Sequence, residues 1–174
     1  PLRLALAGSL ALQNRAAEVI AVTQSSLADA AGLPPWAQVP MLAQQSWART
    51  YTGDPRAGET AARRGLAIAE QAGDAAMTVW ALTALLVAVG RQGRFDEALA
   101  HARRAAALAD SSRDARSLRL HPKLVLGLAL FDCDLVHEAR AAFRAALDDE
   151  FGTGWWLSDS LMADAQVSFV LGEW

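Results

Sequence analysis

Cysteine is almost absent from this chain of 174 residues, which contains only Cys133. A single cysteine excludes an internal disulfide framework and suits a reducing compartment. The first residues also lack the basic segment and the initiating methionine that are typical of a secretory signal. The sequence therefore predicts a cytoplasmic protein.

An excess of positive charge is missing as well, because 16 Lys and Arg residues face 19 Asp and Glu residues. We therefore expect no direct contact with nucleic acid, whose binding depends on clustered cations. An apolar run without a charge covers residues 75–90, between Asp74 and Arg91. This run is shorter than the roughly 20 residues that a membrane span needs. It predicts a buried helix, and we expect no contact with a membrane.

Motifs for catalysis and cofactor binding are also missing. The chain has no GxxxxGK[ST] phosphate loop, no HExxH, no paired-cysteine zinc site and no GxSxG elbow. His137 with Asp134 and Glu138 could hold a metal, and Cys133 with His137 could form a thiol–base pair. A helix start with favourable acids and a structural cysteine are the simpler interpretations. We therefore expect no enzymatic activity, no cofactor and no metal.

What the sequence does contain is a segment that recurs about every forty residues. The letters GRFDEAL at 93–99 align with NRAAEVI at 14–20 and with DLVHEAR at 134–140, and looser copies begin at Gly53 and Gly172. The five starts are 39, 40, 41 and 38 residues apart. A period in this range is typical of stacked helical repeats.

Each unit is predicted to consist of an apolar helix A, a turn and a helix B that has small residues on one face. Leucines and valines in residues 82–89, and alanines in residues 98–109, recur at spacings of three and four. Alternating β-branched runs, which would indicate strands, are almost absent. The sequence predicts one all-α domain over residues 1–174. Its nine helices are expected at 2–12, 15–31, 36–51, 55–72, 75–91, 95–110, 116–131, 135–149 and 155–171.

Local signals explain where these helices begin and end. Gly93 can adopt the left-handed backbone conformation that ends a helix, and Asp134 is among the next-best residues for that position. Asp54, Asp74 and Asp114 each precede a predicted helix and are expected to cap its N-terminus.

The small residues of helix B resemble those of the tetratricopeptide repeat, and the closest fit is the small–aromatic–small set Ala139, Phe143 and Ala146. The resemblance implies a right-handed solenoid of antiparallel helical hairpins. The usual period is about 34, and the proline that normally ends helix B is missing at Asp110, so we expect longer helices. The last helix A has no helix B, which predicts a fragment of a longer chain. Its open apolar face favours homodimer formation through the repeat ends.

The alanine-rich unit GRFDEALAHARRAAALA at residues 93–109 resembles the helical repeats of LuxR-type bacterial transcriptional regulators, the group related to the maltose regulon activator. In that family a nucleotide-binding domain precedes the repeats and a DNA-binding helix-turn-helix follows them. The resemblance implies a non-catalytic sensor and protein-interaction module that binds a small effector or a peptide. A general scaffold for protein–protein interaction is the alternative.

Helix A lines the concave groove of tetratricopeptide arrays, and alignment on Ala98 places aromatic residues repeatedly on this predicted inner face. Large aromatics in a concave surface suit the capture of a peptide or an apolar ligand. Alternatively, the tryptophans fill space between the longer helices. The candidate ligand-binding residues are Trp47, Tyr51, Trp80, Thr83, Arg91, His121, Phe131, Asp159, Met162 and Gln166.

Overall fold

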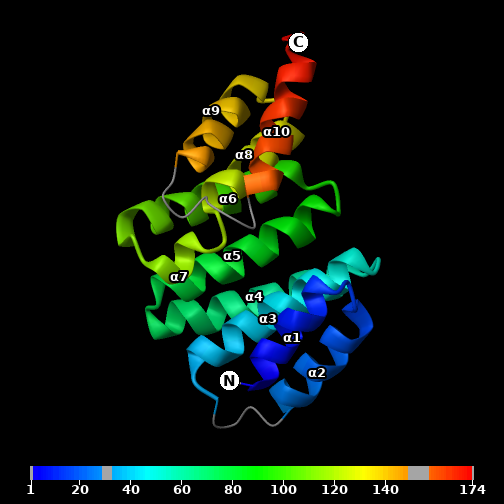
Figure 1. The fold of residues 1–174 in the computed structure, drawn as a ribbon. Coiled ribbons are helices and arrows are strands. Elements are labelled where there is room, and N and C mark those ends of the chain that lie inside the picture. The colour runs from blue at the N-terminus through cyan, green and yellow to red at the C-terminus, as the bar shows by residue number, and fades with distance from the viewer. Residues whose placement is uncertain (1, 29–32, 149–156, 174) are drawn as a thin grey trace.

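The computed structural model describes residues 2–28, 33–148 and 157–173 of the chain. Within these ranges the regular structure is entirely helical, so the predicted all-α class is confirmed for them. The helices, labelled in Figure 1, are α1 Leu2–Leu12, α2 Ala16–Ala28, α3 Pro35–Tyr51, α4 Pro55–Ala72, α5 Ala75–Gly90, α6 Phe95–Ser112, α7 Ala115–Leu118, α8 Pro122–Asp132, α9 Val136–Leu147 and α10 Leu157–Val170.

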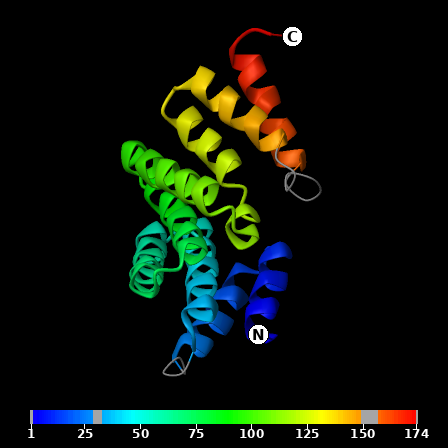
Figure 2. The same ribbon diagram turned by 90° about the vertical axis from the view of Figure 1, so that its left-hand side faces the viewer.

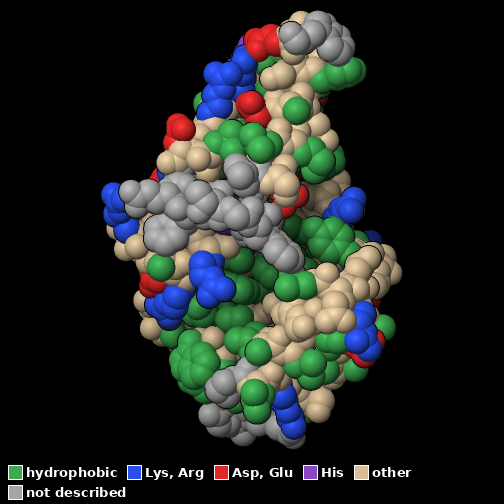
Figure 3. Space-filling model, in the orientation of Figure 1, with side chains coloured by type: hydrophobic (Ala, Val, Ile, Leu, Met, Phe, Trp, Pro, Cys, Tyr) green, Lys and Arg blue, Asp and Glu red, His purple; other side chains and the backbone are tan. Residues whose placement is uncertain are grey.

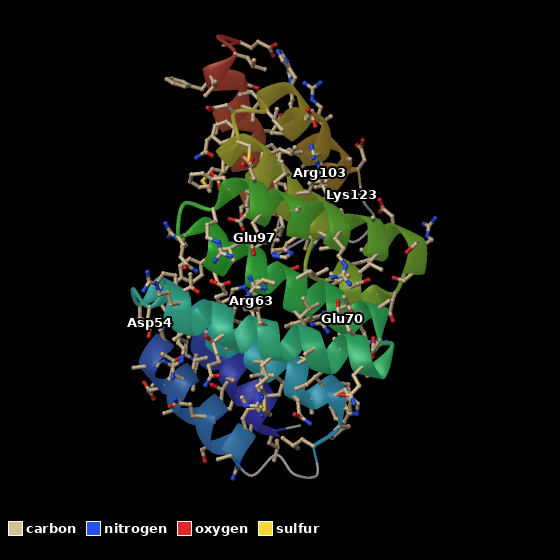
Figure 4. The ribbon with its side chains drawn as sticks, turned by 180° about the vertical axis from the view of Figure 1, so that it is seen from behind. Asp54, Arg63, Glu70, Glu97, Arg103 and Lys123 are labelled. Atoms are coloured by element: carbon tan, nitrogen blue, oxygen red, sulfur yellow. The ribbon has the colours of Figure 1, made fainter. Side chains whose placement is uncertain are left out.

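Consecutive helices pack in pairs that follow one another from the N-terminus to the C-terminus (Figures 1 and 2). We call α1, α3, α5, α8 and α10 the A helices, and α2, α4, α6 and α9 the B helices. Each A helix contacts the next A helix, and each B helix contacts the A helices on either side of it in sequence. Seen from behind, the B helices α4 and α6 lie nearest the viewer (Figure 4). In this part of the molecule, the A helices α3 and α5 therefore lie towards the viewer of Figure 1.

Each A helix is followed, within one to three residues, by one residue with left-handed backbone. Positive φ angles of 58°, 95°, 78°, 59° and 73° occur at Asn14, Gly53, Gly93, Asp134 and Gly172. These are the five predicted turn positions. Because the left-handed region costs an ordinary L-residue about 1–2 kcal/mol, three of the five positions hold glycine.

The predicted N-caps are confirmed at all three aspartates. The Asp54 carboxylate accepts a hydrogen bond from the Ala57 N–H at 3.1 Å, and Asp74 accepts one from Met77 at 3.2 Å. Asp114 accepts one from the Arg116 N–H at 2.8 Å. Each carboxylate satisfies a backbone donor that has no partner within the helix, which fixes where the helix begins.

The apolar run at residues 75–90 is the central helix α5, which contacts α3, α4, α6 and α8. Leu82, Leu85 and Val89 are completely buried, and burial on nearly every side explains why this helix carries no charge. None of the described helices is both long and apolar enough to cross a membrane.

Two glycines allow neighbouring helices to approach closely. A Cβ atom on Gly127 of α8 would lie 2.3 Å from Cε1 of Phe143 of α9. A Cβ atom on Gly58 of α4 would lie 2.2 Å from Oγ1 of Thr50 and 2.8 Å from the carbonyl oxygen of Ser46, both on α3. Glycine at these positions lets the two helices of each hairpin pack directly against each other.

One predicted helix is wrong. Residues 116–131 form two helices, α7 and α8, so the described residues contain ten helices where nine were expected. The break lies at His121, whose φ is 47°, followed by Pro122 as the first residue of α8. Proline has no N–H to continue a helix, and its ring disfavours helical backbone at the preceding residue. The predicted ends at 31 and 149 and the predicted start at 155 lie outside the described residues.

Candidate functional site

The two tryptophans of the predicted groove lie side by side between α3 and α5. The ring centroids of Trp47 and Trp80 are 6.0 Å apart, with an angle of 42° between the ring planes. Both rings pack against buried side chains of the core. The indole N–H of Trp80 donates to the Arg116 carbonyl oxygen at 3.1 Å. Both tryptophans are therefore partly buried, and the Trp80 donor is already used within the protein.

An exposed aromatic–cation pair lies at the C-terminal ends of the same two helices, where Tyr51 is the last residue of α3 and Arg91 caps α5. The Arg91 guanidinium carbon lies 5.6 Å from the centroid of the Tyr51 ring, and that ring is 64% exposed. Such a contact contributes about 0.5–1 kcal/mol at an exposed site. Desolvation raises the pKa of Asp132, at the end of α8, and the positive charge of Arg91 opposes this shift. The last turns of three successive A helices thus bring together an aromatic ring, a cation and an acid.

An apolar pocket of about 460 Å³ lies between the end of α8 and α10. It brings together three of the predicted site residues, Phe131, Met162 and Gln166. Its other lining residues, which are absent from the predicted set, are Ala165, Phe169 and Val170. Met162 is 58% exposed and Phe169 is 64% exposed. The pocket is therefore open to solvent and lined mainly by apolar side chains.

The remaining predicted site residues are not part of either surface. Thr83 is buried, and its hydroxyl donates to the Val79 carbonyl within α5 at 2.8 Å. His121 is also buried, at the left-handed residue that precedes α8. Asp159 is half-buried in the first turn of α10. The predicted groove residues therefore form two separate surfaces. One is the pair Tyr51 and Arg91 at the ends of α3 and α5, and the other is the apolar pocket between α8 and α10.

The face that carries both surfaces is shown in Figure 3. Hydrophobic side chains gather over the lower half of this face and recur in smaller, separate groups towards its C-terminal end. Lys and Arg side chains lie at both sides and also beside the lower hydrophobic group. Exposed apolar side chains next to charged ones are typical of a surface that binds a peptide or a small molecule.

The densest group of charges lies on the opposite face, between α4 and α6 (Figure 4). Arg63 contacts Glu97 at 2.8 Å, and Arg94 contacts Glu59 at 2.7 Å. Burial tends to raise the pKa of Glu59, but hydrogen bonds from Gln92, Arg63 and Arg94 outweigh it and lower that pKa to about 2. Because these charges satisfy one another, the cluster joins the two B helices.

The thiol–base pair considered from the sequence is not formed. Cys133 makes no hydrogen bond with His137 among the described residues, and burial raises the pKa of its thiol. A raised pKa keeps the thiol protonated at neutral pH, whereas a nucleophile needs the thiolate. Within the described ranges, no three His, Cys, Asp or Glu side chains are placed so that they could hold a metal ion.

Comparison with known proteins adds no family assignment, because no protein-family model and no curated protein matches this chain.

Proposed function

We propose that this chain is a non-catalytic binding module, built as a right-handed solenoid of tetratricopeptide-like helical hairpins with a period of about 40. The left-handed residues at 14, 53, 93, 134 and 172 support this proposal, because they recur at that spacing in equivalent turns. Gly73 and Arg113, which follow α4 and α6, also have left-handed backbone, with φ angles of 64° and 48°, and they are 40 residues apart. The packing of each A helix on the next is the contact expected between stacked hairpins.

The ligand of this module is a peptide or a small effector that lies across the A helices. The observation that carries the proposal is that A helices α3, α8 and α10 each carry exposed hydrophobic side chains, namely Tyr51, Leu128, Met162, Phe169 and Val170, of which the last three line one pocket. A ligand that covers these side chains would bury large apolar groups, and the Arg91 guanidinium beside Tyr51 would orient its acidic or aromatic part.

The more specific form of the proposal is the sensor region of a LuxR-type transcriptional regulator, and it is supported by the resemblance of residues 93–109. In that form, ligand binding alters the assembly of the parent protein or its binding to DNA. The gene that encodes the chain provides the test. A phosphate-binding loop encoded upstream and a helix-turn-helix encoded downstream are expected. A reading frame that encodes neither would refute the regulator hypothesis and favour the general interaction scaffold.

A peptide screen tests the binding surface itself. We expect fluorescently labelled peptides selected from a random library to bind with measurable anisotropy changes. Tyr51→Ala and Met162→Ala should each weaken the selected peptides about tenfold or more, which is the effect of removing an interface anchor. Phe95→Ala is the matched control, because Phe95 is 44% exposed but belongs to the B helix α6. Equal losses in all three variants, or no loss in the first two, would refute the assignment.

A further inference from the structure

A second candidate site lies behind α3, away from the groove. An open pocket of about 530 Å³ is formed where α2 and α4 lie on either side of α3. At 100° per residue, its lining residues Gln45 and Arg49 lie on nearly the opposite side of α3 from Trp47 and Tyr51. A ligand in this pocket would therefore not touch the surface proposed above.

The pocket contains polar groups that the rest of the protein does not satisfy. Gln45 is only 9% exposed, and its amide forms no hydrogen bond with any described residue. Arg64 has no ion-pair partner among the described residues, and Arg49 has only Asp54, at 3.8 Å. The Gln45 amide atoms are not among the fully enclosed polar atoms that lack a partner, so they face the open pocket. The arrangement therefore suggests a partner that comes from solution.

The charge of the pocket defines that partner. Its lining includes the two arginines, Gln24 and Gln45, and no described acidic residue. The only acid within Ala16–Ala28 is Glu18, and it already pairs with Arg15 at 2.6 Å. The two guanidinium groups come from different helices, so they can hold one anion between them by charge-assisted hydrogen bonds.

The space between the next two B helices, α4 and α6, is equivalent to this pocket by the forty-residue repeat, and there it is filled by the protein's own side chains. Forty residues after Gln45 and Arg49 come Leu85 and Val89, which are completely buried. Forty residues after Arg64 comes Arg104, which pairs with Glu70 at 2.6 Å. Figure 4 shows Arg63, Glu70 and Glu97 where α4 and α6 face each other. Between α2 and α4, polar residues therefore stand where the next unit has core leucine and valine, and Arg64 has no described acidic partner of the kind that Arg104 has in Glu70.

We propose that the pocket between α2, α3 and α4 binds a small anion that carries carboxylate or phosphate groups. Arg49 and Arg64 bind the anionic oxygens, and the Gln45 amide supplies a further hydrogen bond from the floor of the pocket. The volume is within the range of sites that hold small metabolites. Because it contacts three helices, the bound anion ties the first hairpin to the second.

Isothermal titration calorimetry with inorganic phosphate, pyrophosphate and citrate tests the proposal. We expect saturable 1:1 binding of at least one probe, and the preferred probe distinguishes a phosphate from a carboxylate ligand. Arg64→Gln should weaken that binding at least tenfold, as expected for the loss of a charge-assisted hydrogen bond. Arg104→Gln, the matched control at the equivalent position of α6, should change it less than twofold.

A second variant separates binding from folding. Gln45→Leu introduces the residue found forty positions later, so it should leave the circular dichroism spectrum and the melting temperature of the free protein intact while abolishing saturable binding. The proposal is overturned if none of the three probes binds the unaltered chain. It is equally overturned if Gln45→Leu binds as tightly as the unaltered chain, or if Arg104→Gln weakens binding as much as Arg64→Gln.

Discussion

Replacement of Gly127 by alanine tests the packing of the α8–α9 hairpin most severely. The added Cβ would lie 2.3 Å and 2.4 Å from two carbon atoms of the Phe143 ring. Non-bonded carbon atoms normally approach to about 3.5–4.0 Å. The ring must therefore move by about 1 Å or more. Phe143 is only 1% exposed and belongs to the buried core, so its ring can move only against neighbouring core side chains.

The expected cost follows from two opposing effects. Overpacking of a core typically destabilises a protein by about 1–3 kcal/mol, and the buried ring places Gly127→Ala near the upper limit. Alanine has a helix propensity about 1 kcal/mol more favourable than that of glycine. We therefore expect a net loss of about 2 kcal/mol in the free energy of unfolding. For a chain of this size, that loss lowers the melting temperature by roughly 4–8 °C.

Urea and thermal denaturation, followed by circular dichroism, measure this loss. Gly65→Ala is the matched control, because its Cβ would lie 3.5 Å or more from every neighbouring atom. Gly65→Ala should be neutral or stabilising by up to about 1 kcal/mol. In a Phe143→Leu background, Gly127→Ala should cost less than in the unaltered chain. If Gly127→Ala is as stable as Gly65→Ala, our account of this close contact is wrong.

Three further predictions concern other parts of the fold. Gly58→Ala, whose Cβ would meet Thr50 and the Ser46 carbonyl, should lower the free energy of unfolding in urea by about 1–3 kcal/mol. Asp134→Gly relieves a positive φ of 59° and should raise the melting temperature, because glycine adopts left-handed backbone without the steric contact that even aspartate makes. The pKa of Glu59 is about 2 in the folded state and about 4.5 when unperturbed, so its stabilising contribution is present above pH 4.5 and is lost as the pH falls towards 2. Urea titrations at pH 7 and pH 3 should show this loss in the unaltered chain and a smaller one in Glu59→Gln.

Much of the fold could be predicted because it depends on local signals. Gly93 and Asp134 were identified as turn residues from residue type alone, since few residues tolerate left-handed backbone. Asp54 and Asp74 were identified as caps because their carboxylates act within three residues. The signal for the break before α8 was also present, in Pro122, but the apolar pattern on both sides of it favoured one continuous helix.

The site was less predictable, because burial depends on several helices at once. Thr83 aligns with groove positions of the tetratricopeptide repeat, yet its hydroxyl is satisfied by the Val79 carbonyl inside a buried helix. Trp80 is similarly engaged, with the Arg116 carbonyl. The pocket behind α3 did have a signal in the sequence. Gln45 and Arg49 stand where the next unit has leucine and valine, and only comparison of the two units makes this polar exception visible.

The central claim, that the A helices carry the binding surface, is tested most directly by mapping a bound peptide. Backbone amide chemical shifts of the ¹⁵N-labelled chain would be followed by NMR while the tightest peptide from the screen is added. Our account predicts the largest shifts at the ends of α3, α5 and α8 and along α10, around Tyr51, Arg91, Phe131 and Met162. Largest shifts along α4 and α6, on the face that carries Arg63 and Glu97, would contradict it.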